Sequence, residues 1–209
     1  MRPMKPNRLL DAVVQRIVST EFGPGKHLTA AGLAELLGTS RTPIRECLRS
    51  LEALGLVEVH GNRGAFVVDP ATIEPAEIYD LVETRAQVEP FLMGQAARRR
   101  TEVDIGRIDA ALSDGDTAMA SGDAGGLNIA HHRLLESMLT AAHNDPAAQA
   151  LRPLHHRTCL IVARSAPITL PEGWREHRLV RDAIEARDAE GAADLHRRHL
   201  DQVLSSLAG

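Results

Sequence analysis

Apolar residues recur at helical spacing in three segments near the start of the chain, and each segment stops at a glycine or a turn. The first follows Leu9 to Val18 and ends before Gly23-Pro24-Gly25. The second follows a Thr29 cap and ends at Gly38, and the third runs from Ser40 to Gly55. We therefore predict three short helices.

The apolar spacing changes from helix to strand after these helices. Leu56-Val57-Glu58-Val59 and Ala65-Phe66-Val67-Val68 are β-rich runs, and His60-Gly61-Asn62-Arg63-Gly64 between them is a turn-forming loop. Three helices followed by a β-hairpin are the elements of a winged helix-turn-helix, with the hairpin as the wing. The first predicted domain is thus an α+β domain over residues 1–70.

From residue 71 onward the strand signals disappear and the spacing stays helical. Predicted helices lie near 75–99, 102–120, 124–143, 145–165, 171–188 and 190–207. Thr101-Glu102-Val103-Asp104 resembles a capping box, and Asn144-Asp145-Pro146 marks a break. Short loops between helices predict an all-α antiparallel bundle of six or seven helices, which is the second domain, over residues 71–209.

Composition narrows the class of protein. Hydrophobic residues make up 44% of the chain, enough for real cores, and two cysteines without CxxC spacing indicate neither a disulfide framework nor a cysteine zinc site. Charged residues interrupt the first twenty positions, so we expect a cytoplasmic protein with no membrane partner. Nine Lys/Arg against seven Asp/Glu give residues 1–70 a charge of +2, whereas 15 against 21 give the remainder −6.

The third predicted helix has one cationic face. Arg41, Arg45 and Arg49 stand four residues apart, and this face is either an ordinary solvated surface or a surface for the DNA major groove. Ser40 and Thr42 at the helix start can reach phosphates. At the wing tip, Asn62 and Arg63 can approach a DNA backbone or a minor groove. Aromatic residues are only 2% of the chain, which favours duplex DNA over single strands.

Longer stretches of these residues resemble the N-terminal domain of GntR-family regulators. The matching stretches are Pro24-Gly25-Lys26-His27-Leu28, Leu33-Ala34-Glu35-Leu36-Leu37-Gly38, Ser40-Arg41-Thr42-Pro43-Ile44-Arg45-Glu46 and Gly55-Leu56-Val57 through Asn62-Arg63-Gly64-Ala65-Phe66-Val67. The resemblance implies that Arg41, Arg45 and the wing around Gly64 contact the operator, with Arg49 a further candidate. One departure is Ala30-Ala31-Gly32, where relatives often carry charged residues.

Eight of the ten histidines fall in the predicted bundle. Asn128 and His132 lie four apart along the edge of one apolar stripe, and His177 shares a face with apolar residues of its own helix. In the last helix, spacing leaves His196 and His199 equally open as inward residues. Converging imidazoles can form a metal site in a bundle, although a single such histidine is more often a hydrogen-bonded core residue.

This second half also resembles the ligand-binding domain of the FadR branch of GntR regulators. The residues that carry the resemblance are Asn128 through His132, Leu135, Asn144, His177, Ala183-Ile184, Ala192 and His199. The resemblance implies a divalent metal, such as zinc or nickel, held by Asn128, His132, His177 and His199. It also implies a small carboxylate effector on the metal, to which Arg85 could pair unless Arg85 is exposed or paired with Glu89. Asn128 replaces the usual Asp, and a neutral amide should lower metal affinity.

We therefore predict a ligand-responsive transcriptional regulator, of the repressor type, that binds double-stranded operator DNA as a homodimer. Two alternatives use the same histidines: a metal-dependent enzyme, and a regulator that senses the metal directly. No HExxH pattern and no Ser or Cys nucleophile signature is present in the sequence, which argues against an enzyme.

Overall fold

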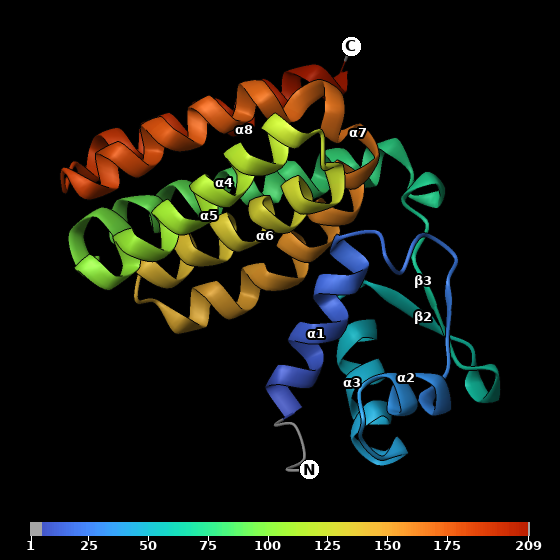
Figure 1. Cartoon of the computed structure of the whole chain (residues 1–209). Helices are drawn as coiled ribbons and strands as arrows, with labels where there is room; N and C mark the ends of the chain where they lie inside the picture. The colour runs from blue at the N-terminus through green and yellow to red at the C-terminus, as the bar shows by residue number, and fades with distance from the viewer. Residues whose placement is uncertain (1–5, 209) are drawn as a thin grey trace.

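The computed structural model of the chain describes residues 6–208, with side chains described over 8–61, 63–161 and 173–207. It has two parts: a small N-terminal domain with a sheet, and a larger set of long helices (Figure 1). The wing residue Asn62 therefore has a described backbone, but its side chain lies outside the described residues.

The N-terminal domain confirms the predicted winged helix-turn-helix. Its elements are α1 (Pro6–Val18), β1 (His27–Leu28), α2 (Ala30–Leu36), α3 (Arg41–Ala53), β2 (Val57–Val59), the 3-10 turn η1 (Gly61–Arg63), β3 (Ala65–Val67) and the 3-10 turn η2 (Pro70–Thr72). Thr29 caps α2 as predicted, because its hydroxyl accepts from the Gly32 amide at 3.0 Å. Gly38, at φ +61°, permits the left-handed turn between α2 and α3.

The hairpin belongs to a three-stranded antiparallel sheet of order β1-β3-β2, in which β1 was not predicted. His27 pairs with Phe66, and Val59 with Ala65. A strand of two residues has too little alternation to be read locally, since only its pairing with β3 defines it. At the wing, Gly64 has φ +97°, and a Cβ there would lie 2.8 Å from His27 Nε2 and 2.9 Å from the Leu28 carbonyl oxygen. Glycine lets the wing approach β1 closely.

The rest of the described chain is helical, as predicted. The helices are α4 (Pro75–Arg99), α5 (Glu102–Ser121), α6 (Ala124–Ala141), α7 (Asp145–Glu185) and α8 (Ala189–Ala208). The predicted break between helices at 145–165 and 171–188 is wrong, because the described backbone is a single 41-residue helix across both ranges. Pro167 and Pro171 lie in this stretch. A proline inside a helix removes one backbone hydrogen bond, and when packing holds the helix on both sides, the proline bends the helix more readily than it ends it.

Capping explains where the bundle helices begin. Thr101 and Asp104 form the predicted capping box, in which the Thr101 hydroxyl accepts from the Asp104 amide and the Asp104 carboxylate accepts from the Thr101 amide. Asp123 caps α6 and Asn144 caps α7 through a side-chain oxygen that accepts from the Gly126 and Ala147 amides, respectively. These short polar residues set the register of each helix and thus which side chains face inward.

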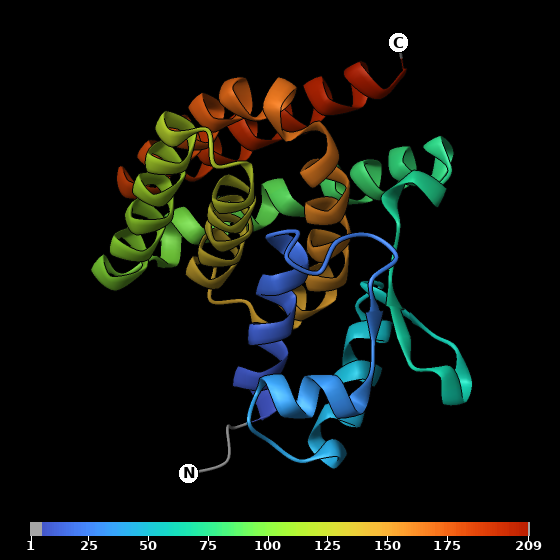
Figure 2. The same ribbon diagram turned by 45° about the vertical axis from the view of Figure 1, so that its right-hand side comes forward.

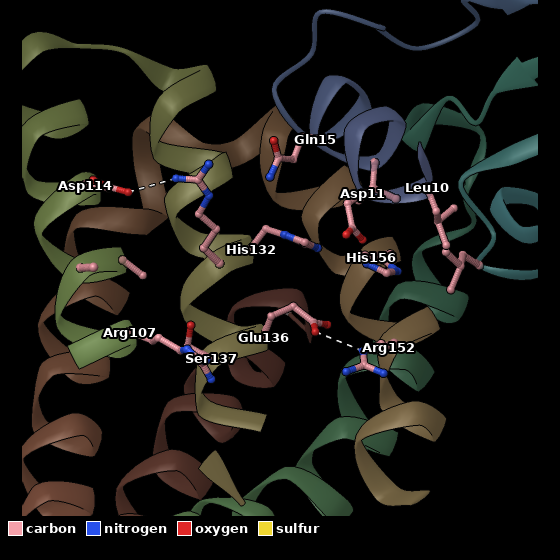
Figure 3. Close-up of a pocket in the computed structure, with 15 residues that line it drawn as sticks. Leu10, Asp11, Gln15, Arg107, Asp114, His132, Glu136, Ser137, Arg152 and His156 are labelled. Carbon is pink, nitrogen blue, oxygen red and sulfur yellow. Dashed lines mark hydrogen bonds and ion pairs between the residues drawn. The ribbon is translucent and has the colours of Figure 1, made fainter. Parts of the chain in front are cut away.

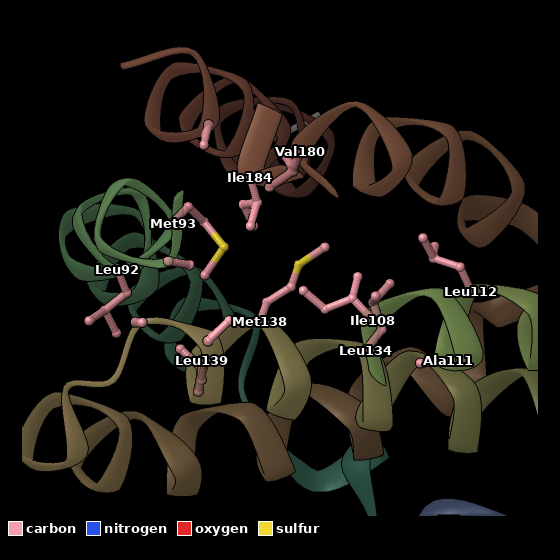
Figure 4. Close-up of a cluster of buried hydrophobic side chains, with 14 of the residues drawn as sticks. Leu92, Met93, Ile108, Ala111, Leu112, Leu134, Met138, Leu139, Val180 and Ile184 are labelled. Atoms are coloured by element: carbon pink, nitrogen blue, oxygen red, sulfur yellow. The ribbon is translucent and has the colours of Figure 1, made fainter. Parts of the chain in front are cut away.

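Two main apolar cores hold the described residues together. The bundle core includes Leu92, Met93, Ile108, Leu134, Met138 and Ile184 from four helices (Figure 4). The second core lies under the sheet and α3, but it also takes in Cys159 and Leu160 from α7. The N-terminal domain is therefore packed on the bundle, with α1 beside α6 and α7 (Figure 2).

Candidate functional site

Helix α3 presents its basic residues to solvent. Its apolar face, formed by Ile44, Cys47, Leu48 and Leu51, is buried as the spacing predicts. Arg41, Arg45 and Arg49 are exposed on the opposite side. Arg49 pairs with Glu46 at 2.7 Å, whereas Arg41 and Arg45 have no ion pair within the part of the chain that the structure describes. Two guanidinium groups are therefore available to an external acceptor.

The start of α3 and the wing frame that surface. Ser40 caps α3 by its backbone, and its side chain makes no capping hydrogen bond, so the exposed hydroxyl is free to donate. Thr42 is exposed beside it. On the wing, Arg63 is exposed at the end of η1, and the neighbouring His27 ring stacks on Phe66 with a centroid separation of 4.6 Å. Because a side chain at Gly64 would collide with the His27 ring, Gly64 has a structural role in the wing in addition to the predicted contact with DNA.

A buried ionic group lies in the centre of the bundle. Glu89 on α4 is 1% exposed and accepts from Arg85 Nε at 2.6 Å, from His155 at 2.6 Å and from His196 at 2.7 Å. Arg85 also donates to the Thr158 hydroxyl at 3.1 Å. Burial by itself would raise the pKa of Glu89, but Arg85 and His155 hold that pKa well below its usual range. Arg85 is thus buried and paired with Glu89, one of the two alternatives open from the sequence.

A group of imidazoles adjoins this ion pair. The His177 ring is 2% exposed, and it lies 4.6 Å from His199 and 5.4 Å from His131 between ring centroids. Neither ring nitrogen of His177 has a partner among the described residues. Burial lowers the pKa of His177 well below its usual value and that of His131 to about 3. The His177 and His131 rings are therefore neutral at pH 7, which is the form that binds metals.

The structure brings only some of the predicted metal ligands together. His177 and His199 are neighbours, and His199 also contacts Glu176 at 2.5 Å. Asn128 is 1% exposed; its amide nitrogen donates to the Val18 carbonyl at 2.6 Å, and its Oδ1 has no partner among the described residues. His132 instead stacks on His156, with centroids 5.1 Å apart.

Several buried residues of this region were not predicted as site residues. They are Glu89, His131, His155 and His156, whereas the spacing leaves buried His196 open as an alternative to His199. His131 had a readable signal, because it stands four residues after Leu127 and three before Leu134 in the apolar stripe of α6. His155 and His156 carry no such signal, since their roles depend on side chains from α4 and α6 that approach only in the fold.

A cavity of about 730 Å³ opens between α1 and the bundle (Figure 3). Asp11 and Gln15 of α1 line one side, and His132, Glu136 and His156 line the other. Burial raises the pKa of Asp11, and the Glu136 carboxylate raises it further. The cavity thus lies between the two domains, and one residue of the predicted metal set, His132, lines it.

Comparison with known families matches both halves of the chain. The family model for bacterial regulatory proteins of the gntR family matches residues 6–67, and the FCD domain matches residues 80–202. None of the described helices has the length and apolar content needed to cross a membrane.

Similar proteins match along most of their length. The galactonate operon transcriptional repressor of Escherichia coli is 32% identical over 213 residues, which cover 90% of this chain and 90% of that protein. The regulator LutR of Bacillus subtilis is 27% identical and covers 90% and 96%. Among solved structures, E. coli McbR/YncC has the same fold, with a TM-score of 0.78 at 20% identity over 99% of this chain and 98% of that one.

Proposed function

Because this chain belongs to the GntR family of bacterial regulatory proteins and carries an FCD domain, we propose that it is a cytoplasmic transcriptional repressor controlled by a small carboxylate. The winged domain binds operator DNA, and the effector binds among the buried polar residues of the bundle. The similar proteins and family matches are transcriptional regulators, and the chain is accordingly a regulator and not an enzyme.

One contact carries the proposal that the two functions are coupled. Asn128 is buried, its Oδ1 has no hydrogen-bond partner among the described residues, and its amide nitrogen donates to the last carbonyl of α1, that of Val18. A ligand that takes the Oδ1 atom would fix or move the same side chain that holds α1. Allostery needs a ligand to bind two arrangements unequally, and this contact supplies a direct route for that difference.

The buried residues fit a divalent metal. Unpartnered atoms among the described residues include Asn128 Oδ1, both ring nitrogens of His177 and Nε2 of His132. Asn128, His132, His177 and His199 would hold the ion, provided that the His132 ring turns from His156 toward His177. Bound there, the metal would supply a positive charge for an effector carboxylate. Arg85 would keep Glu89 neutralised, so that the anionic effector does not meet an uncompensated buried charge.

On DNA, Arg41 and Arg45 would enter the major groove, where arginine donates two hydrogen bonds to guanine. Ser40 and Thr42 would bind phosphates at the start of α3, and Arg49 would reach the backbone once it leaves Glu46. The wing would add Asn62, Arg63 and the Gly64 backbone.

A homodimer follows from the number of contacts. One winged domain has few base contacts, and two domains related by a two-fold axis read a palindromic site. We assign the dimer contact to the domain of residues 71–209, which leaves both copies of α3 open. Sedimentation of the protein without DNA should give a dimer, and a monomer at micromolar concentration would contradict this assignment.

The test is release of DNA by an effector. Selection from random duplex DNA gives the operator, and fluorescence anisotropy then measures its affinity with sugar acids and hydroxy acids present. Galactonate is the first ligand to try, because a similar protein is named for the galactonate operon. We expect one class of small carboxylate to lower operator affinity in wild-type protein and not in His177→Ala, with His143→Ala as the control. A response that survives unchanged in His177→Ala would overturn the assigned pocket.

A further inference from the structure

We propose that His132, Glu136 and His156 form a second metal site, which takes a borderline divalent cation such as Zn²⁺ between the bundle and α1. This site shares His132 with the ligand set of the proposed effector pocket, but its other two ligands, Glu136 and His156, lie outside that set, and it does not depend on the proposed effector.

The three side chains are arranged as metal ligands. Each offers one ligand atom, and these atoms lie within 4.8 Å of one another. His132 and Glu136 are four residues apart on α6 and so share one face, while His156 reaches them from α7. Two imidazoles and one carboxylate are a ligand set that zinc uses when it keeps a fourth position open.

Unpartnered atoms are the second sign of a ligand. Among the described residues, His132 Nε2, Glu136 Oε1 and His156 Nδ1 are buried and have no hydrogen-bond partner. A buried polar atom without a partner is costly, and three such atoms in one cluster call for a shared ligand. Burial also keeps both rings neutral at pH 7, since it lowers the pKa of each to about 4.

The charges of the cavity favour a cation over an anion. The three arginines that line it are each paired with a carboxylate: Arg107 with Asp104 at 3.7 Å, Arg133 with Asp114 at 3.1 Å and Arg152 with Glu136 at 3.1 Å. Arg152 binds Oε2 of Glu136 and leaves Oε1 free (Figure 3). Glu136 can therefore bind a metal through one oxygen while Arg152 orients the other.

The site's position gives the ion a structural effect. Asp11 and Gln15, both on α1, line the same cavity, and Asp11 is the one carboxylate that α1 carries. An ion held by α6 and α7 and completed by Asp11 would tie the DNA-binding domain to the bundle. Since His132 also belongs to the predicted buried set, an ion in one site leaves the other with one ligand fewer.

The experiment is a titration of metal-free, full-length protein with Zn²⁺ by calorimetry and with Co²⁺ by visible absorption. We expect Glu136→Gln and His156→Ala each to lower the affinity of one site by about tenfold or more, because even residues behind the ligands contribute that much. Asp11→Asn should lower it less. His177→Ala removes a ligand only from the effector pocket and should not lower the affinity of this site, so that failure here and failure of the effector pocket give different patterns.

Two control variants separate ligand loss from damage to the fold. Arg152→Gln removes the partner of Glu136 but keeps all three ligands, so it should lower the Zn²⁺ affinity less than Glu136→Gln does. His60→Ala removes an exposed histidine on the wing and should have no effect. Wild-type affinity in both Glu136→Gln and His156→Ala would overturn the site. So would a loss in Arg152→Gln as large as that in Glu136→Gln.

Discussion

Replacing Asn128 with aspartate tests the contact between the bundle and α1. In the structure the Asn128 amide nitrogen donates to the Val18 carbonyl at 2.6 Å and to the Cys159 carbonyl at 3.2 Å. An ionised carboxylate has no proton to donate, and it would face both carbonyl oxygens in a position that is 1% exposed. Asn128→Asp changes few atoms, so its effect reports on hydrogen bonding and charge.

The expected loss follows from the groups left without partners. A buried carbonyl that loses its hydrogen bond costs about 1–3 kcal/mol. Among the described residues, the Val18 carbonyl accepts a hydrogen bond from Asn128 and from no other group. With the second carbonyl and the buried charge included, we expect a loss of about 3 kcal/mol in the free energy of unfolding at pH 7. For a chain of this size, that lowers the Tm by about 6–12 °C.

The pH dependence of the loss gives a second readout. Burial beside two carbonyls raises the pKa of the new carboxyl group above its unfolded value of about 3.9. The folded state then binds more protons than the unfolded state, so the stability deficit grows as pH rises above about 4 and shrinks as pH falls toward it. Once protonated, the carboxyl group can again donate to the Val18 carbonyl.

The assay is thermal unfolding of metal-free protein at pH 5 and pH 7. Asn128→Ala removes the donor without adding charge and should lose less than Asn128→Asp at pH 7. Asn144→Asp is the matched control, because Asn144 caps α7 through a side-chain oxygen that aspartate retains. Equal Tm values for Asn128→Asp and wild type at pH 7 would refute the assigned hydrogen bonds. Added Zn²⁺ should raise the Tm of Asn128→Asp more than that of wild type, because the carboxylate gives the ion an anionic ligand.

Three further predictions concern DNA and pH. Arg45→Ala should weaken operator binding by about 1–3 kcal/mol in anisotropy titrations without changing the Tm. Arg197→Ala, which removes an exposed side chain of α8, should change neither the operator affinity nor the Tm. Arg63→Ala should weaken binding to every duplex and reduce the salt slope by about one, if the wing contacts phosphate; an unchanged slope contradicts this. His131→Phe should flatten the fall in stability on acidification, because the unfolded chain binds a proton at about pH 6.5 and buried His131, with a pKa of about 3, does not. Denaturant unfolding at pH 7, 6 and 5 measures the change of the unfolding free energy with pH, to which His131 contributes up to about 1.4 kcal/mol per pH unit.

Local patterns in the sequence were sufficient for much of the fold. The Thr29 cap and the capping box at Thr101 each join residues three positions apart, so their chemistry is visible in the sequence. The cationic face of α3 is equally readable, because residues four apart share one side of a helix whatever that helix packs against. Glu89 and His131 sit within apolar stripes for the same reason, and their burial was open to prediction.

Tertiary structure decided the remaining features, since they depend on segments far apart in sequence. Strand β1 exists because it pairs with β3, and α7 continues past its predicted end because both of its halves pack into the bundle core, through Leu151 and Val180. Spacing alone placed Asn128 and His132 on one edge of α6, but it could not say what each would meet. In the fold, Asn128 binds the end of α1 and His132 lies against His156, 24 positions later, because the approach of α1 and α7 determines which atoms come within hydrogen-bonding distance.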